Sequence, residues 1–152
     1  MLQSKKVPFT AFETPAEKLG AMETARILNV PVGQVFKTSG VAREKPGKSI
    51  LAVIPGDREV DLKAVAQAVG EKKVRLPTER EAEQLTGLQA GGISPLALIN
   101  KGFQVLLDRS AENYDEIHVS GGQRGLNVRL PVKALVSLTN ARLADLTAQA
   151  EA

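Results

Sequence analysis

Hydrophobic positions in this chain of 152 residues repeat with two different periods. Apolar residues spaced three and four apart predict helices over 16–28 and 61–69, and a capping-box pattern predicts a helix from Thr78 to Leu85 or Thr86. A further short helix is expected to open at Pro131, which suits a first helical turn, and to end at Leu138. Strand-like segments separate these helices, so the pattern predicts an α/β fold.

The strand-like segments are alternating or continuous apolar runs. They span 9–12, 34–39, 50–54, 73–76, 103–107, 116–120 and 126–130. The run 50–54 is apolar throughout, as expected of a strand buried on both faces. Segment 141–146 is either a last strand or a terminal helix. The chain is therefore predicted to form one α/β domain over 1–152, with about seven strands.

Two of the predicted helices carry clear end signals. Asp61 is a candidate N-cap, and Gly70 is a candidate C-terminal stop. Thr78 and Glu81 match a capping box, in which each side chain accepts from the backbone N–H of the other residue. One helical turn is expected over 108–114, directly after a strand.

The composition narrows the possible chemistry. The chain has no cysteine, which excludes thiol catalysis, cysteine-ligated zinc and disulfides. It has one histidine and no paired carboxylates at ligand spacing, so we expect neither a metal nor a cofactor. A formal charge of +3 permits an RNA or phosphate partner. Aromatic residues make up only 3%, which argues against a surface of stacking platforms.

No stretch predicts a secretion signal or a membrane span. Residues 1–12 lack a long apolar segment after the lysine pair at 5–6. No apolar run approaches the roughly 18 residues that a bilayer requires. We therefore expect a cytoplasmic protein with neither a membrane nor DNA as a partner.

The loop over 91–95 is the first candidate for a binding site. Gly91 and Gly92 lack a Cβ and let a ligand approach the backbone closely. Pro95 restricts its own φ and favours an extended Ser94. Such a loop can present backbone N–H groups to a small polar ligand, although the same residues are also ordinary turn formers.

Lys37 interrupts an otherwise apolar strand. A lysine in that position must extend its ammonium to solvent, pair with a carboxylate, or be held for a ligand. In a pocket it would offer a cation to an anionic group or a developing oxyanion.

The glycine-rich turn over 120–125 is the second candidate. It is either a plain hairpin turn or a second glycine-rich side of a binding pocket. In the second case Arg124 would bind a phosphate or anchor the turn. It lies between two strands, so it does not match the dinucleotide-binding pattern, which joins a strand to a helix.

His118 is the only histidine. Ser120 shares its strand face, but two close neighbours on one strand rarely form a catalytic triad. We interpret His118 as a strand residue with a satisfied side chain.

Four segments, in their order and spacing, resemble a known family. They are Gln-Val-Phe-Lys-Thr at 34–38, Asp-Leu-Lys-Ala-Val-Ala at 61–66, Gly-Gly-Ile-Ser-Pro-Leu at 91–96 and Val-Ser-Gly-Gly-Gln-Arg-Gly-Leu at 119–126. From about Phe9 to the C-terminus, the chain resembles the free-standing Cys-tRNA(Pro) deacylases of the YbaK/EbsC type. It is also similar to the editing domain inserted in bacterial prolyl-tRNA synthetases.

The resemblance implies a mixed, barrel-like sheet of roughly seven strands flanked by helices. It implies trans-editing, which is hydrolysis of the ester between a wrong amino acid and the tRNA 3′ end. The implied substrate is Cys-tRNA(Pro) or another small amino acid on tRNA(Pro). The implied partners are the 3′ end of the aminoacyl-tRNA and prolyl-tRNA synthetase.

The resemblance also implies roles for single residues. Lys37 matches the family's essential lysine, and Gly91 opens its glycine–proline loop, so both are expected to be catalytic. Substrate-binding positions are implied at Thr38, Gly92, Ile93, Ser94, Pro95, Ser120, Gly121, Gly122, Arg124 and Asn127. In this family the substrate's own groups carry the reaction while the loop backbone orients the ester. Asn127 is a departure, because many relatives have an acidic residue there.

Two other classes of function stay open. A non-catalytic module could bind an RNA end or a nucleotide with the same loop and cation. A hydrolase of small acyl esters would use the same pocket. The low aromatic content disfavours a binding module that works by stacking.

Overall fold

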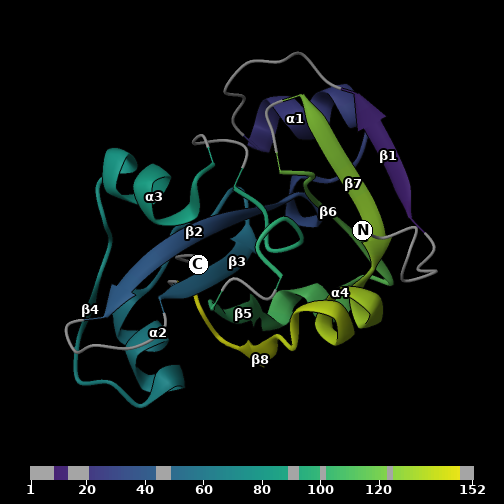
Figure 1. The fold of residues 1–152 in the computed structure, drawn as a ribbon. Helices are drawn as coiled ribbons and strands as arrows, with labels where there is room; N and C mark the ends of the chain where they lie inside the picture. Colours follow the sequence, from purple (N-terminus) through teal and green to yellow (C-terminus); the bar gives the residue numbers. More distant parts are fainter. Residues whose placement is uncertain are drawn as a thin grey trace.

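The computed structural model describes residues 9–13, 21–43, 49–88, 93–99, 102–122 and 125–147. Within these residues, eight strands form two sheets, and four α-helices lie around them (Figure 1). The strands are β1 (Thr10–Glu13), β2 (Phe36–Arg43), β3 (Ile50–Pro55), β4 (Val74–Arg75), β5 (Gln104–Asp108), β6 (Glu116–Ser120), β7 (Leu126–Pro131) and β8 (Arg142–Ala144). The helices are α1 (Ala21–Leu28), α2 (Leu62–Val69), α3 (Glu79–Thr86), α4 (Val132–Thr139) and the short 3-10 helices η1 (Val32–Gln34) and η2 (Arg109–Asn113). The predicted α/β class is confirmed.

The larger sheet is mixed and has the strand order β4-β2-β3-β5-β8. Its strands β2 and β3 are antiparallel, whereas β5 runs parallel to β3 and β8 runs parallel to β5. The smaller sheet, with the order β1-β7-β6, is antiparallel.

The expectation of one barrel-like sheet of about seven strands is wrong. Within the described part of the chain, the eight strands belong to two sheets, and neither closes on itself. A single bridge between Val35 and His118 links the start of β2 to β6. The two sheets meet at this bridge and through side chains, and no continuous ladder of hydrogen bonds closes a barrel.

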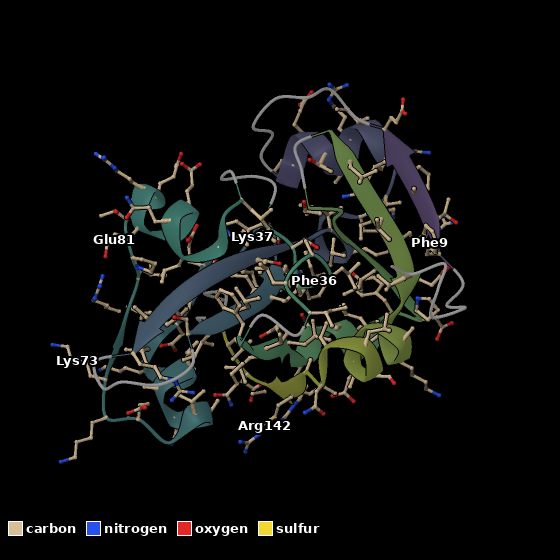
Figure 2. All side chains as sticks on the ribbon, viewed as in Figure 1. Phe9, Phe36, Lys37, Lys73, Glu81 and Arg142 are labelled. Carbon is tan, nitrogen blue, oxygen red and sulfur yellow. The ribbon has the colours of Figure 1, made fainter. Side chains whose placement is uncertain are left out.

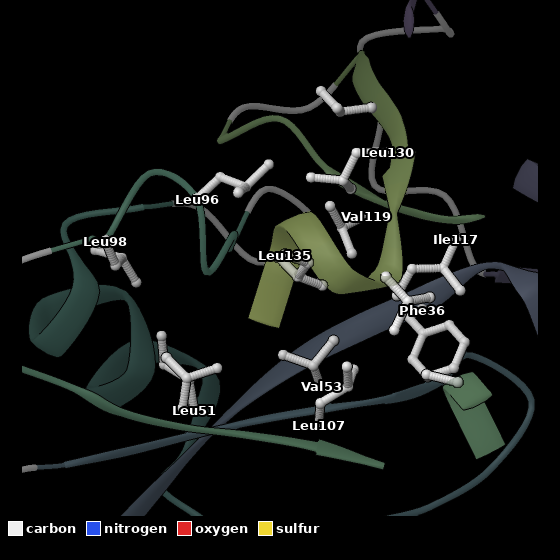
Figure 3. Close-up of a cluster of buried hydrophobic side chains, with 14 of the residues drawn as sticks. Phe36, Leu51, Val53, Leu96, Leu98, Leu107, Ile117, Val119, Leu130 and Leu135 are labelled. Atoms are coloured by element: carbon white, nitrogen blue, oxygen red, sulfur yellow. The ribbon is translucent and has the colours of Figure 1, made fainter. Parts of the chain in front are cut away.

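The apolar core lies on both faces of the larger sheet. Leu51 and Val53 of β3 point into the main cluster, which also receives side chains from the smaller sheet and α4 (Figure 3). Ile50 and Ile54 point the other way, into a second cluster under α2. All of β3 is buried, so the prediction of a strand buried on both faces is confirmed.

The predicted helix signals form as expected. The Asp61 side chain accepts from the backbone N–H groups of Lys63 and Ala64, and Gly70 ends α2 with φ +72°. Thr78 and Glu81 form the capping box at the start of α3. These local hydrogen bonds satisfy backbone groups that the first and last helical turns leave open.

Several boundaries differ from the predictions. Strand β2 continues to Arg43, because Gly40 and Val41 still pair with β3, and Ala42 and Arg43 pair with β4. Pro131 lies at the N-cap of α4, one position before the helix. The open choice for 141–146 resolves to a strand, because β8 adds to the edge of β5. The expected first part of α1, over 16–20, lies outside the described residues.

No helix in the described segments is both long and apolar enough to cross a bilayer.

Candidate active site

Two neighbouring site candidates on β2 point to opposite faces of the larger sheet. Lys37 pairs with Ile54 and Thr38 pairs with Val53 in the antiparallel register. Directly paired residues share a face, so Lys37 lies on the α2 side and Thr38 faces the core between the sheets. Figure 2 shows Lys37 near the middle of the molecule, beside Phe36 on the same strand.

The ammonium of Lys37 reaches solvent. Its Nζ lies 3.7 Å from Oε1 of Glu59, and the two side chains are 37% and 90% exposed. Two of the three possibilities for this lysine, extension to solvent and pairing with a carboxylate, are therefore both seen. An exposed pair of this kind is worth about 1 kcal/mol or less, so the cation can still attract another anion.

The Thr38 hydroxyl is buried and has no hydrogen-bond partner within the structure. Leaving a buried hydroxyl unpaired costs roughly 1–3 kcal/mol. Most buried polar atoms in proteins are paired, and the exceptions are candidates for functional roles. Thr38 thus places an unpaired hydroxyl on the same face of β2 as Phe36.

The described part of the predicted loop is anchored by its side chains. Ile93 and Leu96 join the main apolar cluster, and Pro95 is buried. Ser94 is fully buried, and its Oγ accepts from the backbone N–H of Leu96 at 3.1 Å. The hydroxyl therefore serves the turn itself, which favours the backbone as the loop's contribution to a ligand. Gly91 and Gly92 lie outside the described residues.

The glycine-rich turn packs against this loop. Gly122 has φ +106°, and a Cβ built on it would lie 3.0 Å from Cβ of Ala97. The backbone N–H of Gly122 donates to Ser120 Oγ at 3.2 Å. A Cβ on Gly121 would meet the Leu126 side chain at 2.5 Å. Tight packing thus favours glycine at both positions. The contact of Gly122 joins the turn to Ala97, just after the loop and far away in the sequence. Arg124 lies outside the described residues.

His118 and Asn127 form a buried polar pair on the other face of the smaller sheet. His118 Nδ1 lies 2.8 Å from Asn127 Oδ1, and the exposed fractions of the two residues are 1% and 7%. The hydrogen bond forms when Nδ1 carries the proton. The buried Nε2 has no partner. Our interpretation of a satisfied histidine is therefore correct for one nitrogen and wrong for the other.

The surroundings of His118 favour its neutral form. Burial lowers the pKa of His118, and the charge of Arg129 acts in the same direction. The hydrogen bond to Asn127 and the charge of Glu116 oppose this shift. The Phe12 ring lies 5.5 Å from the imidazole, centroid to centroid. Because Val119 and Val128 face the main cluster, the alternation of β6 and β7 turns His118 and Asn127 away from it.

The candidate residues thus divide among three places. Thr38 and the residues 93–95 border the core between the sheets, and Gly122 reaches the same loop through Ala97. Lys37 lies on the α2 side of β2, and Asn127 lies on the far side of the smaller sheet. Among the described residues, no group of three or more metal-ligating side chains comes together.

A cavity of about 600 Å³ opens beside Pro95. Leu98 after the loop, Phe103 before β5 and Arg142 of β8 line it, together with residues of the loop, of β5 and of the end of α4. The sequence analysis did not single out these residues, because they come from three separate segments and match no motif.

Known proteins are similar to this chain over the segments that hold the candidate residues. The family model for the aminoacyl-tRNA editing domain matches residues 16–138. EbsC of Enterococcus faecalis, named as a candidate Cys-tRNA(Pro)/Cys-tRNA(Cys) deacylase, is 38% identical over 149 residues, which cover 97% of this chain and 90% of EbsC. A proline–tRNA ligase of Staphylococcus aureus is 25% identical over 121 residues, 80% of this chain and 20% of the ligase.

Solved structures agree with this result. A crystal structure described as a candidate trans-editing enzyme for prolyl-tRNA synthetase superposes with a TM-score of 0.81 at 30% identity, covering 93% of this chain and 87% of that one. The hypothetical protein APE2540, at 24% identity and a TM-score of 0.87, shares the fold and covers 97% of this chain and 96% of its own. The resemblance found from the four sequence segments is confirmed, and the chain belongs to the aminoacyl-tRNA editing domain family.

Proposed function

We propose that this chain removes wrong amino acids from tRNA in trans. The reaction is hydrolysis of the ester between the amino acid and the tRNA 3′ end, which yields free amino acid and uncharged tRNA. The observation that carries the proposal is the family match over 16–138, which includes Lys37, the loop 91–95 and the turn 120–125. The names of the similar proteins favour Cys-tRNA(Pro), or another small amino acid on tRNA(Pro), as the substrate.

The loop backbone would stabilise the transition state. Attack on the ester carbonyl develops negative charge on its oxygen, and N–H groups held in place lower the energy of that charge. The backbone around Gly91 to Ser94 would supply these N–H groups. The internal hydrogen bond of Ser94 Oγ supports this assignment, since that hydroxyl already has a partner.

Lys37 would hold the phosphate or the ribose of the terminal adenosine. Strand β4 pairs only with Ala42 and Arg43 of β2, so the edge of β2 beside Lys37 is not covered by β4. The long side chain would reach round this edge toward the loop. Thr38, with its unpaired buried hydroxyl, would bind the substrate on the inner face.

The candidates of the glycine-rich turn over 120–125 would line the binding site opposite the loop 91–95. Gly121 and Gly122 would shape the space for the aminoacyl group, and Arg124 would anchor a phosphate. Ser120, which shares the far face of the smaller sheet with Asn127, would act through its hydrogen bond to the backbone of Gly122. Correct placement of the ester beside a substrate group or a water would supply the remaining rate acceleration.

We further propose that 1–152 acts as one editing domain in the cytoplasm. Prolyl-tRNA synthetase would be its partner, and it would raise the local concentration of the correct tRNA. The second candidate function, binding of an RNA end without catalysis, is consistent with the charge of +3.

A panel of charged tRNAs separates these functions. Cysteine, alanine and proline would each be loaded on tRNA(Pro), and cysteine also on tRNA(Cys), and release would be followed at catalytic protein concentration. Multiple turnovers on one mischarged tRNA, with Pro-tRNA(Pro) spared, are expected. Binding without turnover on every substrate would favour the non-catalytic module instead.

A further inference from the structure

Cations gather where β4 forms the edge of the larger sheet. Lys72, Lys73, Arg75 and Arg80 are all exposed, and together they form what we call the basic edge. Figure 2 shows Lys73 projecting from the side of the molecule where β4 lies, away from Lys37 in the middle.

The backbone of the basic edge is fixed to β2. Ala42 and Arg43 pair with Arg75 and Val74, so the short strand β4 continues the sheet. Arg43 Nη1 also lies 2.7 Å from Oε1 of Glu71, and the exposed fractions of the two side chains are 13% and 15%. A mostly buried pair of this geometry holds the chain just before Lys72 in place.

Lys72 and Lys73 carry the uncompensated charge of the basic edge, whereas Arg75 and Arg80 lie close in sequence to Glu79, Glu81 and Glu83 of α3. The carboxylate of Glu71 forms a salt bridge with Arg43, so it does not neutralise the charges of the two lysines that follow it. Within the described part of the chain, the salt bridges include neither Lys72 nor Lys73. Arg75 pairs with Glu81 at 3.0 Å, but that pair is about half exposed and can exchange its partner for another anion.

Strand β2 sets the distance between the basic edge and Lys37. Arg75 pairs with Ala42, five positions from Lys37 along β2, which corresponds to about 17 Å at roughly 3.3 Å per residue. Lys73 lies two residues further from Lys37 along the antiparallel chain, at about 23 Å by the same rise. The unpaired 3′ end of a tRNA has about four nucleotides, and at roughly 3.4 Å per stacked nucleotide they span about 14 Å, more when unstacked. A 3′ end placed at Lys37 therefore brings the first phosphates of the acceptor stem to the basic edge.

We propose that the basic edge binds the phosphate backbone of the tRNA acceptor stem. This inference rests on the proposed function and adds the surface that holds the body of the substrate. Lysines on phosphates fix position and carry no sequence information, so the contact would strengthen binding to any tRNA. Choice among tRNAs would then depend on a partner protein.

The test compares two substrates with one amino acid. One is the mischarged tRNA that the wild-type chain hydrolyses best, and the other is the same amino acid esterified to the trinucleotide CCA, which has no stem. The variant is the double change Lys72→Gln and Lys73→Gln. The matched control is Lys133→Gln, which removes one exposed lysine from α4.

The double variant is expected to raise KM for the tRNA about fivefold or more and to leave KM for the CCA ester unchanged. Each lost phosphate contact lowers the slope of log affinity against log salt by about 0.7–0.9, so the double variant should lose roughly 1.5. The control should match the wild type on both substrates. Equal KM for the double variant and the wild type, or an equal rise on both substrates, would overturn the inference.

A binding measurement separates this inference from the proposed function. Uncharged tRNA is titrated against wild type and double variant at several salt concentrations, followed by fluorescence anisotropy. If the chain hydrolyses neither substrate, the proposed function fails, and the anisotropy still decides the basic edge. Weaker binding with a shallower salt slope supports it, whereas identical curves mean that the lysines only keep the edge strand from pairing with other chains.

Discussion

His118 Nδ1 on β6 lies 2.8 Å from Asn127 Oδ1 on β7, and the other imidazole nitrogen is buried without a partner. The same histidine forms the bridge to Val35 that links the smaller sheet to the start of β2. The pair therefore lies at the junction of the two sheets, where His118 meets Val35, a residue two positions before Lys37. The protonation of His118 is consequently linked to the integrity of this junction.

Acidification should destabilise the fold through His118. Burial lowers the pKa of His118 below its usual 6.5, so the unfolded chain takes up a proton at a higher pH than the folded chain. The free energy of unfolding should fall as the pH decreases through about 6.5 and continue to fall until the folded pKa is passed. Urea unfolding measured from about pH 8 to pH 5.5 checks this. His118→Gln removes the only histidine, so its curve should lack this part of the pH dependence.

Asn127→Asp should reverse that behaviour. A carboxylate beside Nδ1 favours the imidazolium and raises the pKa of His118. If the folded pKa then exceeds the unfolded value, the added stability is present at low pH and is lost as the pH rises through the folded pKa. The histidine Cε1 proton in NMR reports the pKa directly. Asn127→Leu is the control, and it should lower the pKa further, because it removes the hydrogen bond. An unchanged pKa in both variants would show that Asn127 does not determine the charge of His118.

Lys37→Ala should remove deacylation and keep the fold. Lys37 would position the terminal adenosine, and misplacing the ester by about 1 Å typically costs about 100-fold in rate. The salt bridge to Glu59 is exposed, so the free energy of unfolding should change by about 1 kcal/mol or less. The rate on mischarged tRNA and the thermal midpoint are measured together. Glu59→Gln breaks the same ion pair while keeping the lysine and should retain the wild-type rate. A near-wild-type rate for Lys37→Ala would remove this residue from the site.

Gly122→Ala should impair activity by displacing the loop. Its Cβ would lie 3.0 Å from Cβ of Ala97, and its φ of +106° disfavours any side chain. Two other glycines separate these effects. Gly102→Ala adds the strained φ of +87° without a neighbour within 4 Å, and Gly40→Ala adds neither problem. We expect a loss of about tenfold or more in kcat/KM for Gly122→Ala alone. Equal losses for Gly122→Ala and Gly102→Ala would mean that backbone strain, and not the contact with Ala97, is responsible.

The sequence alone predicted the features that depend on residues close together in the chain. The caps at Asp61 and Gly70 form because their partners lie within a few residues along the chain. The apolar run of β3 predicted burial on both faces, since every position had to avoid water. The order of the four segments was enough to indicate the family, because sequence order does not depend on how the segments pack.

Only the tertiary structure decided which faces and partners these residues have. Alternation showed that Lys37 and Thr38 point apart, but the register of β2 with β3 determined which of them meets the core between the sheets. The contact between Gly122 and Ala97 joins residues far apart in the sequence, and no local pattern encodes such a contact. The bond between His118 and Asn127 depends on the pairing of β6 with β7. The division into two sheets has the same cause: periodicity fixes where a strand lies in the sequence, whereas the strand's neighbours depend on the packing of the whole core.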